Sequence, residues 1–254
     1  MSTERWQKTT PMSLRATIVA AALSLTGGVH ALAADIEVPP APPQSAPANY
    51  FTRPVDWGGL YLGVNGGYAF GTSVWTNADV STGNFGANGG LVGGTLGINY
   101  ANGGGFLFGF EVDADWSGVV GSSSVAACTS LGALPAGTAC ATKSDWLSTG
   151  RLRLGYAFDR ILVFGTAGAA IGDFEIGLNP PGGFRRLPVE LGWTAGGGIE
   201  YAFTHYLTAK VEYLFVDLGT VSCPMDGTCG VLQSASASLK ENLVRAGFNY
   251  KFTW

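Results

Sequence analysis

Charge is what this sequence has least of: Asp, Glu, Lys and Arg make up only 13% of its 254 residues, about half the usual share. The net charge is −4, and the basic residues form no run that could neutralise a line of phosphates, which excludes nucleic acid as a partner. Beyond the N-terminal region no stretch holds about 18 uninterrupted apolar residues, which argues against a helical membrane protein.

Glycine and apolar residues are abundant instead. The 39 glycines are about twice the average share, and hydrophobic residues make up 46% of the chain. This apolar content excludes a disordered protein, and the glycines lack the triplet period of collagen. What remains is a large all-β chain.

The N-terminal region has the pattern of an export signal. Arg15 precedes an apolar stretch at 16–25, and Ala31 and Ala33 stand in an A-x-A arrangement. We therefore expect residues 1–33 to be a secretory signal peptide that is cleaved after Ala33. The alternative, a transmembrane anchor, is disfavoured because the apolar run is short and interrupted. Translation starts at either Met1 or Met12, and the sequence leaves this choice open.

Residues 34–56 contain six of the 12 prolines, which favours an extended, semi-rigid periplasmic spacer. A ligand for an envelope partner is the alternative function of this segment. The domain organisation expected is a signal peptide at 1–33, a Pro-rich spacer at 34–56 and a barrel at 57–254.

From Trp57 onward, segments of about 12 residues with alternating apolar side chains recur. The expected strands span 57–71, 89–100, 105–118, 146–158, 161–173, 190–203, 206–219 and 240–254. Their connections alternate between hairpin-sized turns and long segments. The long ones cover 72–88, 119–145, 174–189 and 220–239. This alternation predicts an eight-stranded antiparallel transmembrane β-barrel, with short periplasmic turns and four long extracellular loops.

The two faces of each strand differ in polarity. In the segment 105–118, for example, the even-numbered residues from Phe106 to Trp116 are apolar. The odd-numbered residues between them include Glu111, Asp113 and Asp115. Eight strands enclose a lumen just wide enough for side chains to fill, so the many aromatic residues must face outward. Strand ends also carry aromatic residues that we expect in interfacial girdles. These are Trp57, Tyr61, Trp116, Trp146, Tyr201, Tyr206 and Trp254.

The inward positions then form a nearly balanced set of charges. The expected members are Glu111, Asp113, Asp115, Arg151, Arg153, Glu200, Lys210, Glu212, Arg245 and Lys251. Charges in a narrow, poorly hydrated core must be paired, because an uncompensated charge costs several kcal/mol. We expect a salt-bridge network that plugs the lumen. The alternative is a selective pore lined by the same charges, and inward glycines such as Gly196 and Gly198 leave some room for it.

Several stretches resemble a known family. STGRLRLGYAFDRILVFGTAGAAIGDF at 148–174, GWTAGGGIEYAFTHYLTAKVEYLFVDLG at 192–219 and VRAGFNYKF at 244–252 are similar to the small outer-membrane β-barrel proteins of alphaproteobacteria. These are called outer-membrane immunogenic or surface-antigen proteins and are loosely grouped as a porin family. The resemblance implies location in the bacterial outer membrane and a C-terminal aromatic assembly signal. Phe252 occupies the usual final position here, and Trp254 keeps the alternation two residues later.

The four cysteines fall in two of the expected long loops, Cys128 and Cys140 in one and Cys223 and Cys229 in the other. In an oxidising compartment we expect a disulfide within each loop. A metal site is the alternative, but the spacings do not suit one and neither loop contains histidine. Pairing between the loops stays open.

No enzyme chemistry is expected. His205 is the single histidine beyond residue 33, and it falls in a short turn at the periplasmic end. We expect no cofactor and no metal. The expected function is a structural, surface-exposed barrel that supports envelope integrity, with a narrow porin or a loop-borne adhesin or receptor as alternatives.

The expected partners are outer-membrane lipid, lipopolysaccharide and the barrel-assembly machinery. Peptidoglycan and a host ligand are further candidates. Arg185 and Arg186 could contact lipopolysaccharide phosphates, and Phe184 in the same loop would favour the receptor.

Overall fold

The computed structural model describes residues 55–77, 80–132, 134, 136–179, 184–186, 190–222 and 235–252. The predicted signal peptide, most of the predicted spacer, Cys223, Cys229 and Trp254 lie outside the described residues, so those assignments stay predictions. Among the described residues, no helix is long and apolar enough to cross a membrane.

Eight long strands make up most of the described chain. They are β1 (Gly59–Asn77), β3 (Phe85–Ala101), β4 (Phe106–Ser122), β5 (Ala139–Phe158), β6 (Ile161–Gly172), β9 (Glu190–Ala202), β10 (Leu207–Ser222) and β11 (Ala235–Phe252). Shorter elements lie in the connections: β2 (Val80–Ser81), α1 (Val125–Thr129), β7 (Glu175–Asn179) and β8 (Phe184–Arg186). Each long strand overlaps one of the eight predicted segments.

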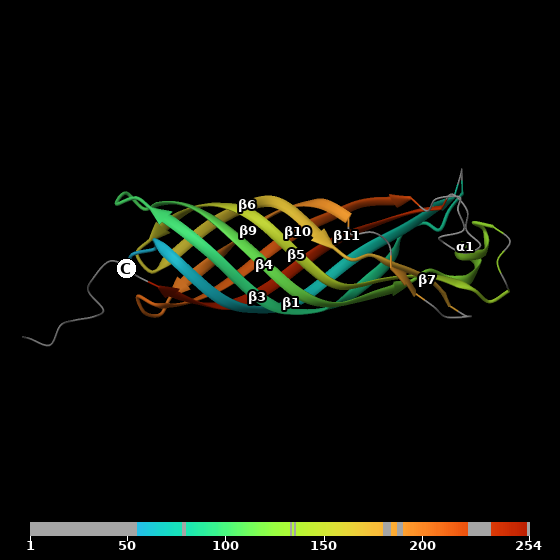
Figure 1. Cartoon of the computed structure of the whole chain (residues 1–254), viewed down its shortest axis with the longest axis horizontal. Coiled ribbons are helices and arrows are strands. Elements are labelled where there is room, and N and C mark those ends of the chain that lie inside the picture. The colour runs from blue at the N-terminus through green and yellow to red at the C-terminus, as the bar shows by residue number, and fades with distance from the viewer. Residues whose placement is uncertain are drawn as a thin grey trace, which may run out of the picture. The chain divides into compact units, whose positions relative to one another are not determined.

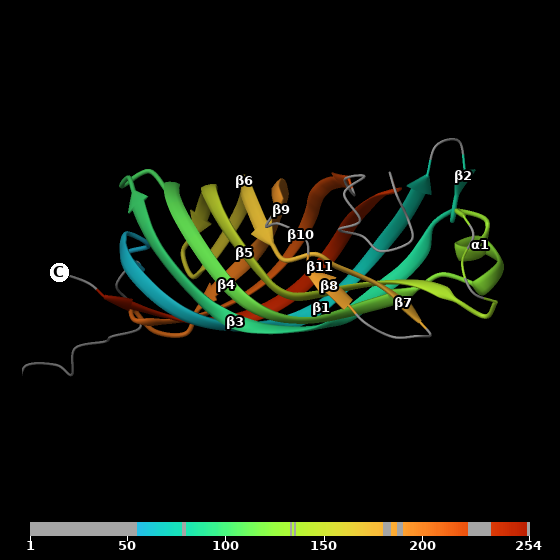
Figure 2. The same cartoon turned by 45° about the vertical axis from the view of Figure 1, so that its right-hand side comes forward.

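Antiparallel pairing closes the long strands into a ring. The order is β4-β3-β1-β11-β10-β9-β6-β5, and a further pairing of β4 with β5 completes the circle. Figures 1 and 2 show the strands winding obliquely around a common axis, with α1 and β7 at one end. The turns β3–β4, β5–β6 and β9–β10 lie together at the other end, which we call the short-turn end; the opposite end is the loop end. The predicted eight-stranded antiparallel barrel is confirmed.

The strands are longer at the loop end than the alternation predicted. β1 continues to Asn77, β4 to Ser122, and β5 begins at Ala139, so Cys140 lies on a strand rather than in a loop. The reason is that outward side chains there become polar, as at Thr72 and Lys143, while backbone pairing continues. An apolar alternation identifies only the part of each strand whose outer face is apolar.

The outer face of the barrel is apolar. Leu154, Phe108 and Phe248 are typical, each more than half exposed, at 63%, 51% and 55%. Burying such a face in hydrocarbon stabilises the barrel, whereas in water it would be an aggregation site. Two predicted girdle residues are placed differently, because Trp57 and Tyr61 are 3% and 1% exposed and lie inside the barrel.

The interior consists of three layers along the barrel axis. At the short-turn end, apolar side chains cluster: Val55, Trp57, Leu107, Leu162, Phe164 and Ala202. At the loop end a larger apolar cluster includes side chains from the strands, the α1 loop and β7, among them Trp75, Leu91, Cys128, Leu131, Leu147, Phe174, Ile176, Leu214, Val216, Leu239 and Leu243. Between them lies a layer of buried charged residues.

Candidate functional site

The charged layer is formed by alternate residues of five strands. Its carboxylates come from β4, β9 and β10, and its cations come from β5, β10 and β11, because inward positions recur with a period of two. All ten residues predicted to face inward are buried, with at most 3% exposure: Glu111, Asp113, Asp115, Arg151, Arg153, Glu200, Lys210, Glu212, Arg245 and Lys251.

Arg151 lies at the centre of this layer. Its Nη2 donates to Glu111 Oε1 and Asp113 Oδ2, both at 2.5 Å, and its Nη1 donates to Glu212 Oε2 at 3.0 Å. The residue and its partners span the lumen, since β5 and β10 are not neighbours in the sheet. A single guanidinium therefore links opposite walls of the barrel.

Arg245 and Lys210 add further contacts to the carboxylates around this centre. Arg245 Nη1 lies 2.5 Å from Asp115 Oδ2, and its Nη2 lies 2.9 Å from Glu212 Oε1. Lys210 Nζ donates to Glu111 Oε1 at 2.9 Å and lies 3.3 Å from Glu212 Oε1. Charge-assisted contacts of this kind offset the cost of removing the ions from water.

A second part of the layer lies nearer the short-turn end. Arg153 pairs with Glu200, which also accepts hydrogen bonds from Thr208 and, at 2.9 Å, from Asn249. The Arg153 guanidinium also lies 3.8 Å from the centre of the Phe164 ring. Arg153 thus joins the charged layer to the apolar layer below it.

Lys251 differs from the expectation. Its Nζ donates to the backbone carbonyl of Asp56 and lies 5.5 Å from the centre of the Trp57 ring, and it has no carboxylate within ion-pair distance among the described residues. The physical reason is position: Lys251 is the last inward residue of β11, so it lies beside the segment that enters the barrel. Lys251 fastens residues 56–57 rather than joining the network.

Neutral polar residues outside the predicted set of inward charges complete the layer. Tyr61 donates to Glu111 Oε2 at 2.6 Å, and Thr95 and Thr149 donate to the two Asp113 oxygens at 2.8 and 2.9 Å. The inward parity of β1 and β3 was the signal that could have identified Tyr61 and Thr95. Tyr61 was assigned to a girdle instead because of its place near a strand end.

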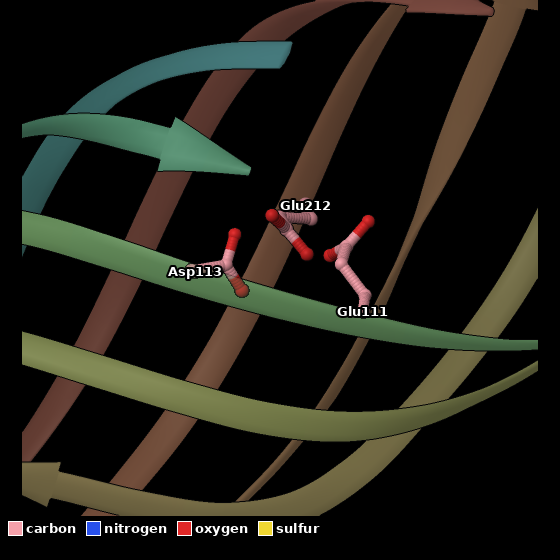
Figure 3. Close-up of side chains that lie close together, drawn as sticks. All are labelled: Glu111, Asp113 and Glu212. Carbon is pink, nitrogen blue, oxygen red and sulfur yellow. The ribbon is translucent and has the colours of Figure 1, made fainter. Parts of the chain in front are cut away.

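Glu111, Asp113 and Glu212 point toward one another from β4 and β10 (Figure 3). Their ligand oxygens lie within 4.8 Å of one another, as three ligands of a metal ion would. Arg151 contacts all three of these carboxylates. The positive charge at this point is therefore supplied by protein side chains.

A second acidic group, Asp145, Asp173 and Glu175, lies at the loop end. Arg186 contacts the three carboxylates at 3.5, 3.4 and 3.0 Å, and Lys143 pairs with Asp145 at 2.6 Å. The hydrogen bond to Glu175 and the nearby Asp173 raise the pKa of Arg186. These contacts hold Arg186 against the barrel rim, although its side chain is 59% exposed.

Side chains also bridge the lumen at the loop end. The hydroxyls of Ser73 on β1 and Thr142 on β5 are 2.9 Å apart, and Trp75 Nε1 donates to Thr142 Oγ1 at 3.0 Å. These residues could not be identified from apolar alternation, because all three fall in segments that were expected to be loops. They continue the inward parity of β1 and β5 beyond the predicted strand ends.

Cys128 and Cys140 form a disulfide, with Cα atoms 5.3 Å apart. It joins α1 to the start of β5, and both cysteines are buried in the loop-end apolar layer. Ser124 caps α1 by accepting a hydrogen bond from the Ala127 amide at 3.2 Å. Asn77 Nδ2 donates to the Leu131 carbonyl at 2.6 Å, so the α1 loop is also held by β1.

The other predicted site residues lie apart from the charged layer. Phe252 ends β11 opposite Leu60 and is 43% exposed on the outer face. Phe184 and Arg186 lie on β8 at the loop end, and Phe184 is 46% exposed. His205 lies in the turn between β9 and β10 at the short-turn end.

A family model described as "Outer membrane protein beta-barrel domain" matches residues 19–252. The chain is 34% identical over 251 residues to the 31 kDa outer-membrane immunogenic protein of Brucella melitensis, covering 92% of this chain and 99% of that protein. It is 30% identical over 196 residues to the 22 kDa outer membrane protein of Rhizobium leguminosarum, covering 77% of this chain and 78% of that one.

Solved structures with similar strand arrangements have little sequence in common with the chain. OprG from Pseudomonas aeruginosa has a TM-score of 0.48 and 13% identity, covering 78% of this chain and 97% of that one. Neisserial surface protein A has a TM-score of 0.42 and 12% identity, covering 76% of this chain and 97% of that one.

Proposed function

Because the chain belongs to the outer membrane protein β-barrel family, we propose that it is a structural, surface-exposed barrel whose interior is closed to solutes. Its location is the bacterial outer membrane. The short-turn end then faces the periplasm and the loop end faces the outside, as in other barrels of this class. The chain contributes to envelope integrity by holding a rigid cylinder in the membrane and presenting its loops.

One observation carries this proposal: the paired charges of the middle layer lie between two apolar layers. Arg151, with contacts to both β4 and β10, crosses the space through which a solute would pass. A conducting pore needs charges that are hydrated and accessible, and here each residue of the layer is nearly inaccessible to water. A set of unpaired inner charges would have favoured the pore, whereas nine of the ten predicted inner charges form ion pairs and Lys251 binds a backbone carbonyl.

Rigidity is the physical benefit of such an interior. Breaking a buried ion pair by removing one partner costs about 3–5 kcal/mol, so the network opposes any change in the spacing of the strands. The two apolar layers add the burial of side chains such as Trp75 and Phe164. A barrel filled in this way resists deformation by the surrounding lipid.

We also propose that the chain is not an enzyme. Catalysis at the outer surface needs a nucleophile and a base held together there, whereas His205 lies in a turn at the opposite end. The Brucella relatives are named outer-membrane immunogenic proteins. We place lipid and lipopolysaccharide around the barrel and the assembly machinery at its C-terminal strand as proposed partners.

A solute-flux assay tests the closed interior. Residues 34–254 would be refolded into liposomes, and swelling would be followed after dilution into solutions of small sugars and amino acids. We expect swelling no faster than that of protein-free liposomes, with an open porin at equal density as the positive control. Swelling whose rate falls with solute size would refute the proposal and establish a narrow porin.

The loops have a separate test, because a surface-exposed barrel should display them on intact cells. An epitope tag inserted after Gly137, in the loop that follows α1, should bind antibody without permeabilisation. The same tag inserted after Gly103, in the β3–β4 turn, should bind antibody only after the outer membrane is opened. The reverse result would invert the proposed orientation.

A further inference from the structure

One buried carboxyl belongs to neither of the ion-pair groups described above. Glu241, on β11, is 1% exposed, and its Oε1 has no hydrogen-bond partner in the part of the chain that the structure describes. It pairs in register with Gly71 of β1 and Val216 of β10. This acid therefore lies within the loop-end apolar layer, above the charged layer.

Among the described residues, no side chain forms an ion pair with Glu241. Its inward neighbours on the three paired strands are apolar or small: Leu239 and Leu243 on β11, Leu214, Val216 and Leu218 on β10, and Ala69, Gly71, Ser73 and Trp75 on β1. Along the inward faces of β11 and β10 the next charged side chains are Arg245 and Glu212, which bind each other, and Arg245 also binds Asp115 of β4. On β1 the nearest inward titratable group is Tyr61, at the short-turn end.

Glu241 lies beyond the lipid-facing part of its strand. The outward side chains of β11 change from Val244, which is 49% exposed and apolar, to Asn242 and Lys240. Lys240 pairs with Asp217 across the outer face of β10. Burial alone raises the pKa of the Glu241 carboxyl from 4.5 to about 7.

We propose that the loop-end apolar layer is a pH-sensitive closure of the barrel mouth, which stays packed while Glu241 is protonated and admits water when the carboxyl ionises. A protonated carboxyl fits an apolar layer, whereas an unpartnered carboxylate must either find water or be expelled. The side chains that would have to separate include Trp75 and Leu239, near the bridge from Ser73 to Thr142. The closed interior proposed above is the starting state.

The direction in which pH shifts the opening equilibrium follows from proton binding. In the packed mouth the carboxyl titrates near 7, and in an opened, hydrated mouth it titrates near its ordinary value of 4.5. Between these values the packed state holds a proton that the opened state releases, so rising pH favours opening. The opening equilibrium should increase about 30-fold between about pH 5.5 and about pH 8.5.

Hydrogen exchange of the full mature chain in lipid vesicles tests this. Backbone protection in the loop-end halves of β1 and β11 would be compared between the natural chain and Glu241→Gln at both pH values, since the ratio cancels the intrinsic pH dependence of exchange. The measured quantity is the exchange rate of the natural chain divided by that of the variant. We expect this ratio to be about 30-fold larger at the higher pH than at the lower. Asp217→Asn, at an outward position on the adjacent strand, should leave the pH dependence of the natural chain unchanged.

Equal pH dependence in the natural chain and Glu241→Gln would overturn the proposal, as would the same effect from Asp217→Asn. If Glu241→Gln fails to fold, Glu241→Leu, which also removes the charge, is the second variant. The exchange ratio reports opening of the mouth whether or not the barrel conducts. Failure here would therefore leave the flux result unaffected.

Discussion

Arg151→Ala should destabilise the barrel more than any other single truncation in the charged layer. The guanidinium contacts Glu111, Asp113 and Glu212, and the side chain is fully buried. Without it, these carboxylates keep Lys210, Arg245 and, for Glu111 at 3.8 Å, Arg153, all of which already have other partners. Removing one partner of a buried ion pair costs about 3–5 kcal/mol, and we expect a loss in this range.

The assay is equilibrium unfolding by urea of the mature chain in lipid vesicles, followed by tryptophan fluorescence. Arg186→Ala is the matched control, because Arg186 also contacts three carboxylates but is 59% exposed at the loop end. Exposed ion pairs contribute about 0–1 kcal/mol, so the control should unfold almost as the natural chain does. Equal effects of the two substitutions would refute the reasoning that burial makes the inner network costly to break.

A double-mutant cycle measures the contribution of the contact between Glu111 and Arg151 separately from the effect of each single substitution. Glu111→Gln combined with Arg151→Ala should recover part of the lost stability, because the double variant leaves fewer uncompensated carboxylates. Strict additivity of the two losses would show that the residues do not act through their contact.

Three further substitutions test other parts of the account. Gly93→Ala should prevent folding, because the added Cβ would lie 2.2 Å from the Ala114 carbonyl oxygen. The outward Gly94→Ala should fold, because its Cβ would lie 3.7 Å from the Gly63 carbonyl oxygen. Equal refolding yields of the two variants would contradict this. Cys128→Ser with Cys140→Ser should lower stability by about 2–4 kcal/mol and speed protease cleavage near α1, and unchanged cleavage would argue against the disulfide as a restraint. Leu154→Arg, on the lipid-facing side, should cost about 2–4 kcal/mol of unfolding free energy in vesicles, and no loss would contradict the assigned outer face.

Much of the fold could be predicted from the sequence because the barrel has a simple repeat. Inward and outward residues alternate, and turns alternate with loops, so strand number and closure follow from local patterns. Glu111 and Arg151 could be assigned to the interior by parity alone, and the structure places them in contact at 2.5 Å. Parity identifies the side of the sheet that a residue faces.

Parity does not give the height of a residue along the barrel axis, and this explains what the sequence did not predict. Lys251 and Arg245 share a face of β11, yet their heights give them different partners. The three-layer interior is likewise a consequence of register, which depends on strand stagger. Trp57 and Tyr61 were assigned to a girdle from their place near a strand end, although inward parity puts them inside.

Single-channel recording tests the central claim most directly, since it detects one open pore among many closed barrels. Residues 34–254 would be refolded and added to a planar bilayer in concentrated salt, with voltages of both signs. The account predicts no reproducible current steps from the natural chain. Steady, discrete openings that change size in Arg151→Ala would contradict it and would make the charged layer the lining of a narrow pore.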